Sequence, residues 1–507
     1  MAIIPSIVNK LNYKRLNQIE LFKKYPEKIQ EDVLKMLLAK ASKTEWGRKY
    51  DYSSVKSVKE YQTRVPIQTY EDLLPDIEKL RNGERNLFWP GEIKWFAKSS
   101  GTTNTKSKFI PITYESLVDC HYRGGKDVLM IYTRQNPDTK IFKGKGLILG
   151  GSHRINNFSN KSLYGDLSAI LLENAPFWVN MIRTPNTRIA LLEDFEEKLD
   201  RITRLTVKEN VTNLSGVPSW YLVLIKQILA YSGKSNLMEV WPNLEVFFHG
   251  GISFEPYRDQ FNHFIPGGSM HYMETYNASE GFFGLQDDLS INDMLLMLDL
   301  GIYYEFIPAD KVKTENPPCY TIGEVKKDIS YAMVISTNGG LWRYMIGDTV
   351  KFTSLRPYKF IISGRTKQFI NAFGEEVIVE NAEKALEAAC KATGAFVSEY
   401  TAGPVFIGTT SKGSHEWIIE FEKEPYDIDQ FTIILDEKLK SINSDYEAKR
   451  FKDLNLVKPV VRSVPRGTFY KWFREKNKLG GQNKVPRLVN SREYIEELYR
   501  IAGFGNK

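Results

Sequence analysis

The sequence predicts an α/β protein with two units: a large layered domain of mixed sheets flanked by helices, and a smaller, mobile α+β domain at the C-terminus. Three observations predict this fold class. The first eighty residues carry helical periodicity, short β-rich runs then alternate with helix-like stretches, and the pattern changes again near residues 363–370. We therefore expect domains at residues 1–365 and 366–507. A length of 507 residues suits two to four folding units.

The elements follow in chain order. Near the N-terminus, apolar residues recur at helical spacing: Ile29, Val33, Leu34, Leu37 and Leu38. Thr69 and Asp72 have the spacing of a capping box, which predicts a helix that begins at Tyr70. From about residue 92, strands are expected in KGLILG, NVTNLSG, LEVFFHG, HYMETY and AMVIST, and helices over 162–175, 190–209 and 218–231.

Asn338-Gly339 lies between AMVIST and LWRYMIGD and predicts a hairpin with a type I′ turn. The second unit is expected to contain an amphipathic helix in NAEKALEAACKAT, strands around 395–421 and another helix from about 427 to 443. A basic segment ends the chain.

Composition excludes several classes of protein. Apolar residues make up 42% of the chain, enough to build cores without disulfides. Cys120, Cys319 and Cys390 form no CxxC pair, which argues against a disulfide scaffold, a zinc ribbon or a thioredoxin-like site. Lys226 and Asp299 interrupt the longest apolar runs, and the N-terminus lacks the pattern of a secretory signal. We expect a cytoplasmic protein without a membrane segment.

The positive charge is concentrated at the C-terminus. Residues 449–507 contain 15 Lys+Arg and 5 Asp+Glu, a net charge of +10, whereas the remainder carries −3. Such a segment could bind nucleic acid or attract an anionic small molecule. No RNA-binding aromatic motif or zinc finger supports the first possibility, so nucleic acid is the less favoured partner.

The first candidate site is the segment from Lys98 to Lys108, which contains SSGTTNT between two expected strands. Its hydroxyl groups, glycine and lysines are the donors that polyphosphate oxygens need. It is not a Walker A loop, because it returns to a strand instead of opening a helix. The alternative is an ordinary Ser/Thr/Lys hairpin tip.

The second candidate combines His249-Gly250-Gly251, at the end of a strand, with ETYNASEG at residues 274–281. Paired glycines permit close approach of a flat ligand. Tyr276 could stack on a base, and Glu280, four residues later, could bind Mg²⁺. The alternatives are a packed tyrosine and a solvated glutamate.

Three further segments complete the set. Asp348, after Gly347, could accept hydrogen bonds from a ribose diol or could cap a turn. Residues 363–370, at the change of pattern, suggest a hinge. The segment His121-Tyr122-Arg123-Gly124-Gly125-Lys126 is a possible substrate-facing patch or a helix crossing. The chain has no GxSxG elbow, no dinucleotide fingerprint and no HExxH metal site.

Taken in order, these segments resemble the adenylate-forming enzymes. Within them the sequence is most similar to the auxin-responsive acyl-acid amido synthetase family, in a bacterial-type form. The resemblance extends from SSGTT to Gly480-Gly481-Gln482-Asn483-Lys484-Val485-Pro486-Arg487-Leu488. Two departures occur. The first loop lacks the Gly-x-Pro-Lys sequence usual in acyl-CoA synthetases, and Asn277-Ala278 stands where many relatives have smaller residues.

The resemblance implies a role for each motif residue, with ATP and Mg²⁺ as cofactors. Ser99, Ser100, Gly101, Thr102 and Thr103 would hold the β- and γ-phosphates, with Lys106 or Lys108 adding charge. Gly250, Gly251, Thr275, Tyr276 and Ser279 would contact the base and the α-phosphate, and Glu280 would bind Mg²⁺. Asp348 and Arg365 would hold the ribose, Lys367 would lie at the hinge, and Lys484 would be the mobile catalytic lysine.

The implied function is a ligase that adenylates a carboxylic acid with MgATP and transfers the acyl group to an amine, expected to be an amino acid, with release of AMP and pyrophosphate. Two alternatives remain open: an acyl-CoA ligase with a thiol acceptor, and a catalytically silent nucleotide- or nucleic-acid-binding protein on the same fold. The sequence points to no particular acid and to no base that would deprotonate the amine.

Overall fold

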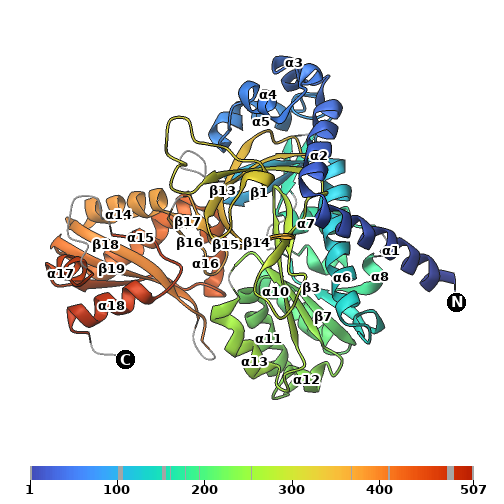
Figure 1. Ribbon diagram of the computed structural model, residues 1–507. Helices are drawn as coiled ribbons and strands as arrows, with labels where there is room; N and C mark the ends of the chain where they lie inside the picture. Colours follow the sequence, from blue (N-terminus) through green and yellow to red (C-terminus); the bar gives the residue numbers. More distant parts are fainter. Residues whose placement is uncertain are drawn as a thin grey trace.

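A computed structural model describes residues 3–100, 107–150, 156–159, 161–176, 179–192, 194–252, 254–366, 368–408, 412–476 and 485–504. The first eighty residues are helical, as predicted: α1 Ile3–Lys24, α2 Pro26–Ala41, α3 Glu45–Lys49, α4 Val58–Arg64 and α5 Tyr70–Arg81 (Figure 1). The capping box is confirmed, because the side chains of Thr69 and Asp72 each bond the other's backbone N–H. No helix in the described ranges is long and apolar enough to cross a membrane.

A large mixed sheet forms the centre of the molecule. Among the described residues its strand order is β12-β13-β14-β15-β11-β10-β9-β8-β7-β3-β6. The strands are β3 Lys145–Ile148, β6 Arg183–Thr184, β7 Val211–Gly216, β8 Val246–Gly250, β9 His271–Ala278, β10 Gly281–Leu285, β11 Met294–Leu296, β12 Ile302–Pro308, β13 Ser330–Thr337, β14 Tyr344–Leu355 and β15 Tyr358–Arg365. Strands β6, β3, β7, β8 and β9 run parallel, so their carboxyl ends lie at one edge.

Helices cover both faces of this parallel half. Val246 and Phe248 of β8 share a core with Val128 and Ile131 of α6 (Arg123–Gln135), which continues from the π-helical turn η2 (Ser116–Tyr122). Phe247, between them, belongs to a second core with α10 Phe195–Thr206, α11 Pro218–Ser232 and α13 Arg258–Phe264. The remaining helices here are α7 Leu167–Glu173, α8 Val179–Ile182, α9 Thr187–Ala190 and α12 Leu237–Val240. Alternation along β8 thus gives each face its own helices.

A smaller sheet has the order β2-β1-β5-β4, with β1 Trp95–Ser100, β2 Ser107–Ile112, β4 Asn156–Ser159 and β5 Ser162–Gly165. This corrects two predictions. A helix over 162–175 is wrong at its start, because residues 162–165 pair with β1 and β4 and the helix begins at Leu167. Ser99 and Ser100 lie in β1 and not in a loop, since they pair with Lys108 and Ser107.

The hairpin between β13 and β14 exists, but the predicted type I′ turn is wrong. The connection spans residues 338–343, and the positive φ angles lie at Gly340 (91°) and Arg343 (43°) instead of at Asn338-Gly339. Asn338 is occupied elsewhere: its backbone N–H donates to Gly301 O and its carbonyl accepts from Thr113 Oγ1. These long-range bonds override the local turn preference.

Within the described residues, the C-terminal unit, orange to red in Figure 1, contains the three-stranded sheet β18-β19-β20, the two-stranded sheet β16-β17 and several helices. Its elements are β16 Phe369–Ile370, β17 Val377–Ile378, α14 Val379–Thr393, β18 Phe396–Val405, β19 Ser414–Lys423, α15 Ile428–Ile442, α16 Ser444–Arg450, β20 Val460–Val464, α17 Thr468–Glu475 and α18 Glu493–Ala502. The expected helices and strands of this unit are confirmed. It contacts the large domain through Tyr257, which donates to Ala372 O, and through Lys449 above the Trp220 ring.

Candidate active site

The second motif, His249-Gly250-Gly251 with residues 274–281, lies at the carboxyl edge of the parallel strands. Gly250 of β8 lies beside Thr275 of β9, and a Cβ at Gly250 would lie 2.3 Å from the Thr275 carbonyl oxygen. Thr275 Oγ1 donates to His249 O at 3.1 Å. Gly251 has φ +82°, which favours glycine. Both glycines are therefore required by the backbone, and they leave the edge open for close approach of a ligand.

Tyr276 and Asp348, predicted from separate motifs, are in direct contact. The Tyr276 hydroxyl donates to the Asp348 carboxylate, although the two residues are 72 positions apart. The Tyr276 ring is buried and lies 4.9 Å from the Phe283 ring, centroid to centroid. Asp348 pairs with Arg365 across β14 and β15, next to an irregularity in the register. The fold thus brings the predicted base and ribose residues together.

Glu280 follows β9 in the tight connection to β10, and its surroundings are charged. Burial raises the pKa of Glu280, the charge of Lys108 lowers it, and the charges of Asp348 and Glu376 raise it further. Charged residues of β2, β14 and the C-terminal unit therefore lie close enough to act electrostatically on one carboxyl group. Such a group of carboxylates favours a bound cation, because a cation relieves their mutual repulsion.

The donor set fits Mg²⁺ held by one carboxylate together with phosphate oxygens. Within the described part of the chain, no three His, Cys, Asp or Glu side chains are grouped as a metal cage. Glu280 would hold the ion, while Lys108 and the neighbouring strand β1 would face the phosphates.

The segment after the predicted hinge lies against the same edge. The Asn371 side chain donates to Gly251 O at 3.3 Å, and its Oδ1 accepts from Glu376 N at 3.3 Å. Glu376 has φ +42°, and Gly374 before it has φ +88°. Glu375 is fully buried, accepts from the backbone of Phe373 and bonds His415 Nε2 at 2.8 Å. The C-terminal unit thus contacts this sheet edge through the hydrogen-bonded turn at residues 371–376.

Several predicted residues lie outside the described residues: Gly101, Thr102, Thr103, Lys106, Lys367 and Lys484. The side chains of Ser100 and Arg365 are likewise outside them. Ser279 is half-buried. It precedes Glu280 in the connection between β9 and β10.

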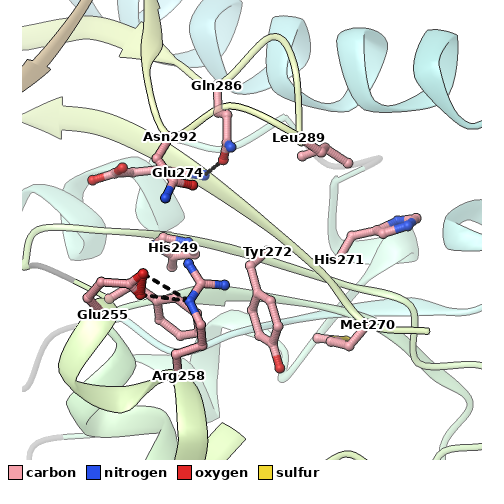
Figure 2. A pocket seen from close by; sticks show the side chains of 11 residues that line it. His249, Glu255, Arg258, Met270, His271, Tyr272, Glu274, Gln286, Leu289 and Asn292 are labelled. Carbon is pink, nitrogen blue, oxygen red and sulfur yellow. Dashed lines mark hydrogen bonds and ion pairs between the residues drawn. The ribbon is translucent and has the colours of Figure 1, made fainter. Parts of the chain in front are cut away.

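A cavity of about 320 Å³ that sequence reasoning missed adjoins this edge (Figure 2). His249 and Glu274, register partners on β8 and β9, line it with Arg258 of α13, which is paired with Glu255 at 2.7 Å. Burial raises the pKa of Glu274, and burial and the charge of Arg258 lower the pKa of His249 to about 3. Glu274 lies two residues before Tyr276, so alternation along β9 was the signal that could have found it.

These features bring the residues of the separate sequence motifs to one sheet edge, and comparison with solved structures agrees on the fold. The chain resembles a GH3.15 acyl acid amido synthetase, with a TM-score of 0.61 and 19% identity over 96% of this chain and 95% of that one. It also resembles a 2-hydroxyisobutyryl-CoA ligase solved with an acyl-AMP and CoA, with a TM-score of 0.56 and 14% identity over 95% and 93%.

The chain belongs to the GH3 family. The GH3 family N-terminal domain matches residues 15–270, the central domain residues 295–365 and the C-terminal domain residues 380–493. Among curated proteins, an indole-3-acetic acid-amido synthetase GH3.3 of Arabidopsis thaliana is 23% identical over 96% of this chain and 93% of its own length. The jasmonoyl-L-amino acid synthetase JAR6 of Nicotiana attenuata is 24% identical over 96% and 95%.

Proposed function

We infer that this chain is an ATP-dependent, AMP-forming ligase that adenylates a carboxylic acid and transfers the acyl group to the amine of an amino acid. The observation that carries the inference is the convergence of Gly250, Tyr276, Glu280 and Asp348 at one sheet edge in a chain that matches the GH3 family along most of its length. Amido synthetases that act on auxin and jasmonate are its full-length relatives.

The residues have distinct tasks in this mechanism. Gly250 and Gly251 allow the adenine to lie against the strand ends, and Tyr276 stacks on it. Asp348 accepts hydrogen bonds from the ribose hydroxyls, which replace the hydrogen bond from the Tyr276 hydroxyl. Ser99, Ser100 and Lys108 are assigned to the β- and γ-phosphates, and Glu280 would hold Mg²⁺, which would neutralise phosphate charge. The acid's carboxylate then attacks the α-phosphate, and pyrophosphate leaves.

The C-terminal unit supplies the second part of the proposal. Lys484 reaches the α-phosphate during adenylation, and its charge stabilises the transition state. The unit then rotates about Lys367, so that the amine reaches the acyl-adenylate. The turn that holds Glu375, Glu376 and Asn371 against Gly251 is the contact that such a rotation would break.

A thioester-forming reaction is the second candidate, because the 2-hydroxyisobutyryl-CoA ligase has the same fold. The amide is favoured because the curated full-length relatives are amido synthetases. A cytoplasmic location is part of the proposal, since all three cysteines are free.

An ATP–pyrophosphate exchange screen across aryl, indolyl and fatty acids tests the function. We expect exchange only when an acid and Mg²⁺ are both present. ATP binding without exchange for any acid would instead support a silent nucleotide-binding protein. Salt-sensitive affinity for DNA or RNA through residues 449–507 would favour a nucleic-acid-binding protein.

A further inference from the structure

Next to the nucleotide edge, a histidine of a π-helical turn is bonded to the residue that follows Tyr276. His121 lies near the end of η2, and its Nδ1 is 2.8 Å from Asn277 Oδ1. His121 is buried, with 4% of its surface exposed, whereas Asn277 is exposed. π-Helical turns are rare and occur frequently at functional sites. The contact joins residues 156 positions apart in the sequence.

The direction of this hydrogen bond follows from chemistry. An amide oxygen only accepts, so His121 Nδ1 carries the proton and donates it. Burial lowers the pKa of His121 to about 4, so the ring is neutral at physiological pH. With Oδ1 of Asn277 held by the imidazole, the amide is fixed, and its Nδ2 donors are turned away from His121 on an exposed side chain.

Packing alone does not explain an imidazole at this position. The second ring nitrogen of His121 is buried without a hydrogen-bond partner within the described part of the chain. A buried polar atom without a partner is unfavourable to folding, and an apolar ring would avoid that loss. The hydrogen bond to Asn277 explains the imidazole, because an apolar ring at position 121 would have no N–H to donate to the Asn277 oxygen.

Asn277 lies on the face of β9 opposite to the predicted adenine site. Its cross-strand neighbour is Phe282, whose ring packs so closely on α6 that a Cβ at Gly124 would lie 2.4 Å from it. Cross-strand neighbours share a face, so Asn277 faces the α6 side. Tyr276 faces the other side, where it contacts Phe283 and Asp348. Asn277 is also only three residues from Glu280.

This placement separates the two reactants, if the proposed function is correct. The adenine occupies the Tyr276 face, and the phosphates lie beyond the strand ends near Ser279 and Glu280. The acid must reach the α-phosphate without displacing the adenine, so it approaches from the α6 face. There the fixed amide of Asn277 is the donor next to the reacting carboxyl group.

We propose that Asn277 is a catalytic residue whose Nδ2 donates a hydrogen bond to the acyl oxygen of the bound acid, and that His121 is the positioning residue that orients it. One carboxylate oxygen forms the bond to the α-phosphorus as the bond from that phosphorus to pyrophosphate breaks, and the other becomes the acyl carbonyl oxygen that Asn277 binds. The amine nitrogen then attacks the carbonyl carbon, and this oxygen takes the negative charge. The charge returns to re-form the carbonyl as the C–O bond to AMP breaks, and the nitrogen loses its proton to solvent.

The test measures single-turnover amide formation and ATP affinity in the full-length enzyme. The probes are indole-3-acetate, 4-hydroxybenzoate and octanoate, each with an amino-acid mixture, and the acid that gives most product is carried forward. Asn277→Ala should slow amide formation at least about tenfold, because one oxyanion donor is lost. The ATP Kd should change less than about twofold, since Tyr276 and Asp348 are untouched.

His121 is tested by its effect through Asn277. His121→Phe should slow amide formation as much as Asn277→Ala, and His121→Gln, which keeps an N–H donor, should retain more activity. The double variant His121→Phe/Asn277→Ala should be no slower than Asn277→Ala alone, because coupled residues are not additive. Asn243→Ala is the matched control, because Asn243 bonds Asn210 at the opposite end of β8.

Unchanged amide formation in Asn277→Ala would overturn the proposal, even if His121→Phe fails to fold. Additive losses in the double variant would overturn the positioning role of His121. A wild-type enzyme that binds ATP yet gives no acid-dependent exchange or amide would refute the proposed function itself, which distinguishes the two failures.

Discussion

Two charged groups five residues apart, Arg343 and Asp348, have opposite surroundings. Arg343 is buried and binds both oxygens of Glu305, at 2.9 and 3.1 Å, and its remaining donors reach Gln62 O and Val65 O. The charges of Arg343 and Glu305 are thus paired with each other inside the protein. At the edge, burial raises the pKa of Glu280, the charge of Lys108 offsets this only in part, and the charges of Asp348 and Glu376 raise the pKa further. We propose that the charges gathered at this sheet edge serve a ligand, whereas the paired charges in the core hold the fold together.

The largest expected effect concerns the compensated region. Arg343→Ala leaves Glu305 buried without its cation, so the free energy of unfolding should fall by about 3–5 kcal/mol. Urea unfolding followed by circular dichroism measures it. Arg204→Ala, which removes an exposed pair with Asp200, is the control and should leave the free energy of unfolding close to that of the wild type. Equal losses in both variants would contradict the role given to Arg343.

At the ligand edge, the effects should appear in rate. Lys484→Ala should slow adenylate formation on the order of 100-fold, because it removes the cation that acts only in that transition state. Consumption of a supplied acyl-adenylate should change much less. Rapid-quench assays of each half-reaction measure the two rates. If both steps slow equally, Lys484 is structural.

Removing a carboxylate of the edge should have a smaller effect. Glu280→Ala or Asp348→Ala should slow pyrophosphate exchange at least about tenfold, which corresponds to about 1.4 kcal/mol. The melting temperature should stay near that of the wild type, in contrast to Arg343→Ala. Wild-type exchange rates in both variants would remove these residues from the site.

The smallest effect is a gain in stability. The pKa of Glu280 is raised in the folded state, so the folded protein loses stability as pH rises from the ordinary glutamate pKa through the folded one. Glu280→Gln should therefore raise the melting temperature by about 1–2 °C at pH 8 and by less at pH 5. Differential scanning calorimetry at the two pH values measures it. Glu31→Gln, at an exposed position of α2, is the control. A lower melting temperature of Glu280→Gln at pH 8 would show that Glu280 is compensated in the way Glu305 is.

The sequence could predict elements with local signals, but not the contacts between distant segments that build both regions. Local signals predicted the capping box at Thr69 and the helix α14, because their hydrogen bonds close within a few residues. The strand that ends at Gly250 was predicted from its short β-rich run, although its ladder hydrogen bonds go to the distant strands β7 and β9. The sequence also singled out Tyr276 and Asp348 separately. It did not predict their contact, because that depends on the register of a sheet built from distant segments.

Other parts of the site could not be predicted either, because they also depend on the pairing and packing of distant segments. Glu274 lines the cavity of Figure 2 only because β8 and β9 pair in parallel at His249. The sequence allowed two interpretations of the segment that contains His121, a substrate-facing patch or a helix crossing. The hydrogen bond from His121 to Asn277 arises from the packing of η2 on β10. Ser99 was expected in a loop, and its pairing with Lys108 placed it in a strand.

The measurement that tests the central claim most directly is product analysis with competing acceptors. The enzyme receives ATP, Mg²⁺, its acid, an amino-acid mixture and coenzyme A, and mass spectrometry follows AMP, amide and thioester. We expect AMP and amide in equal amounts and no thioester. The rate should rise with pH as the amine deprotonates. Stoichiometric thioester without amide would contradict the account and make the protein an acyl-CoA ligase.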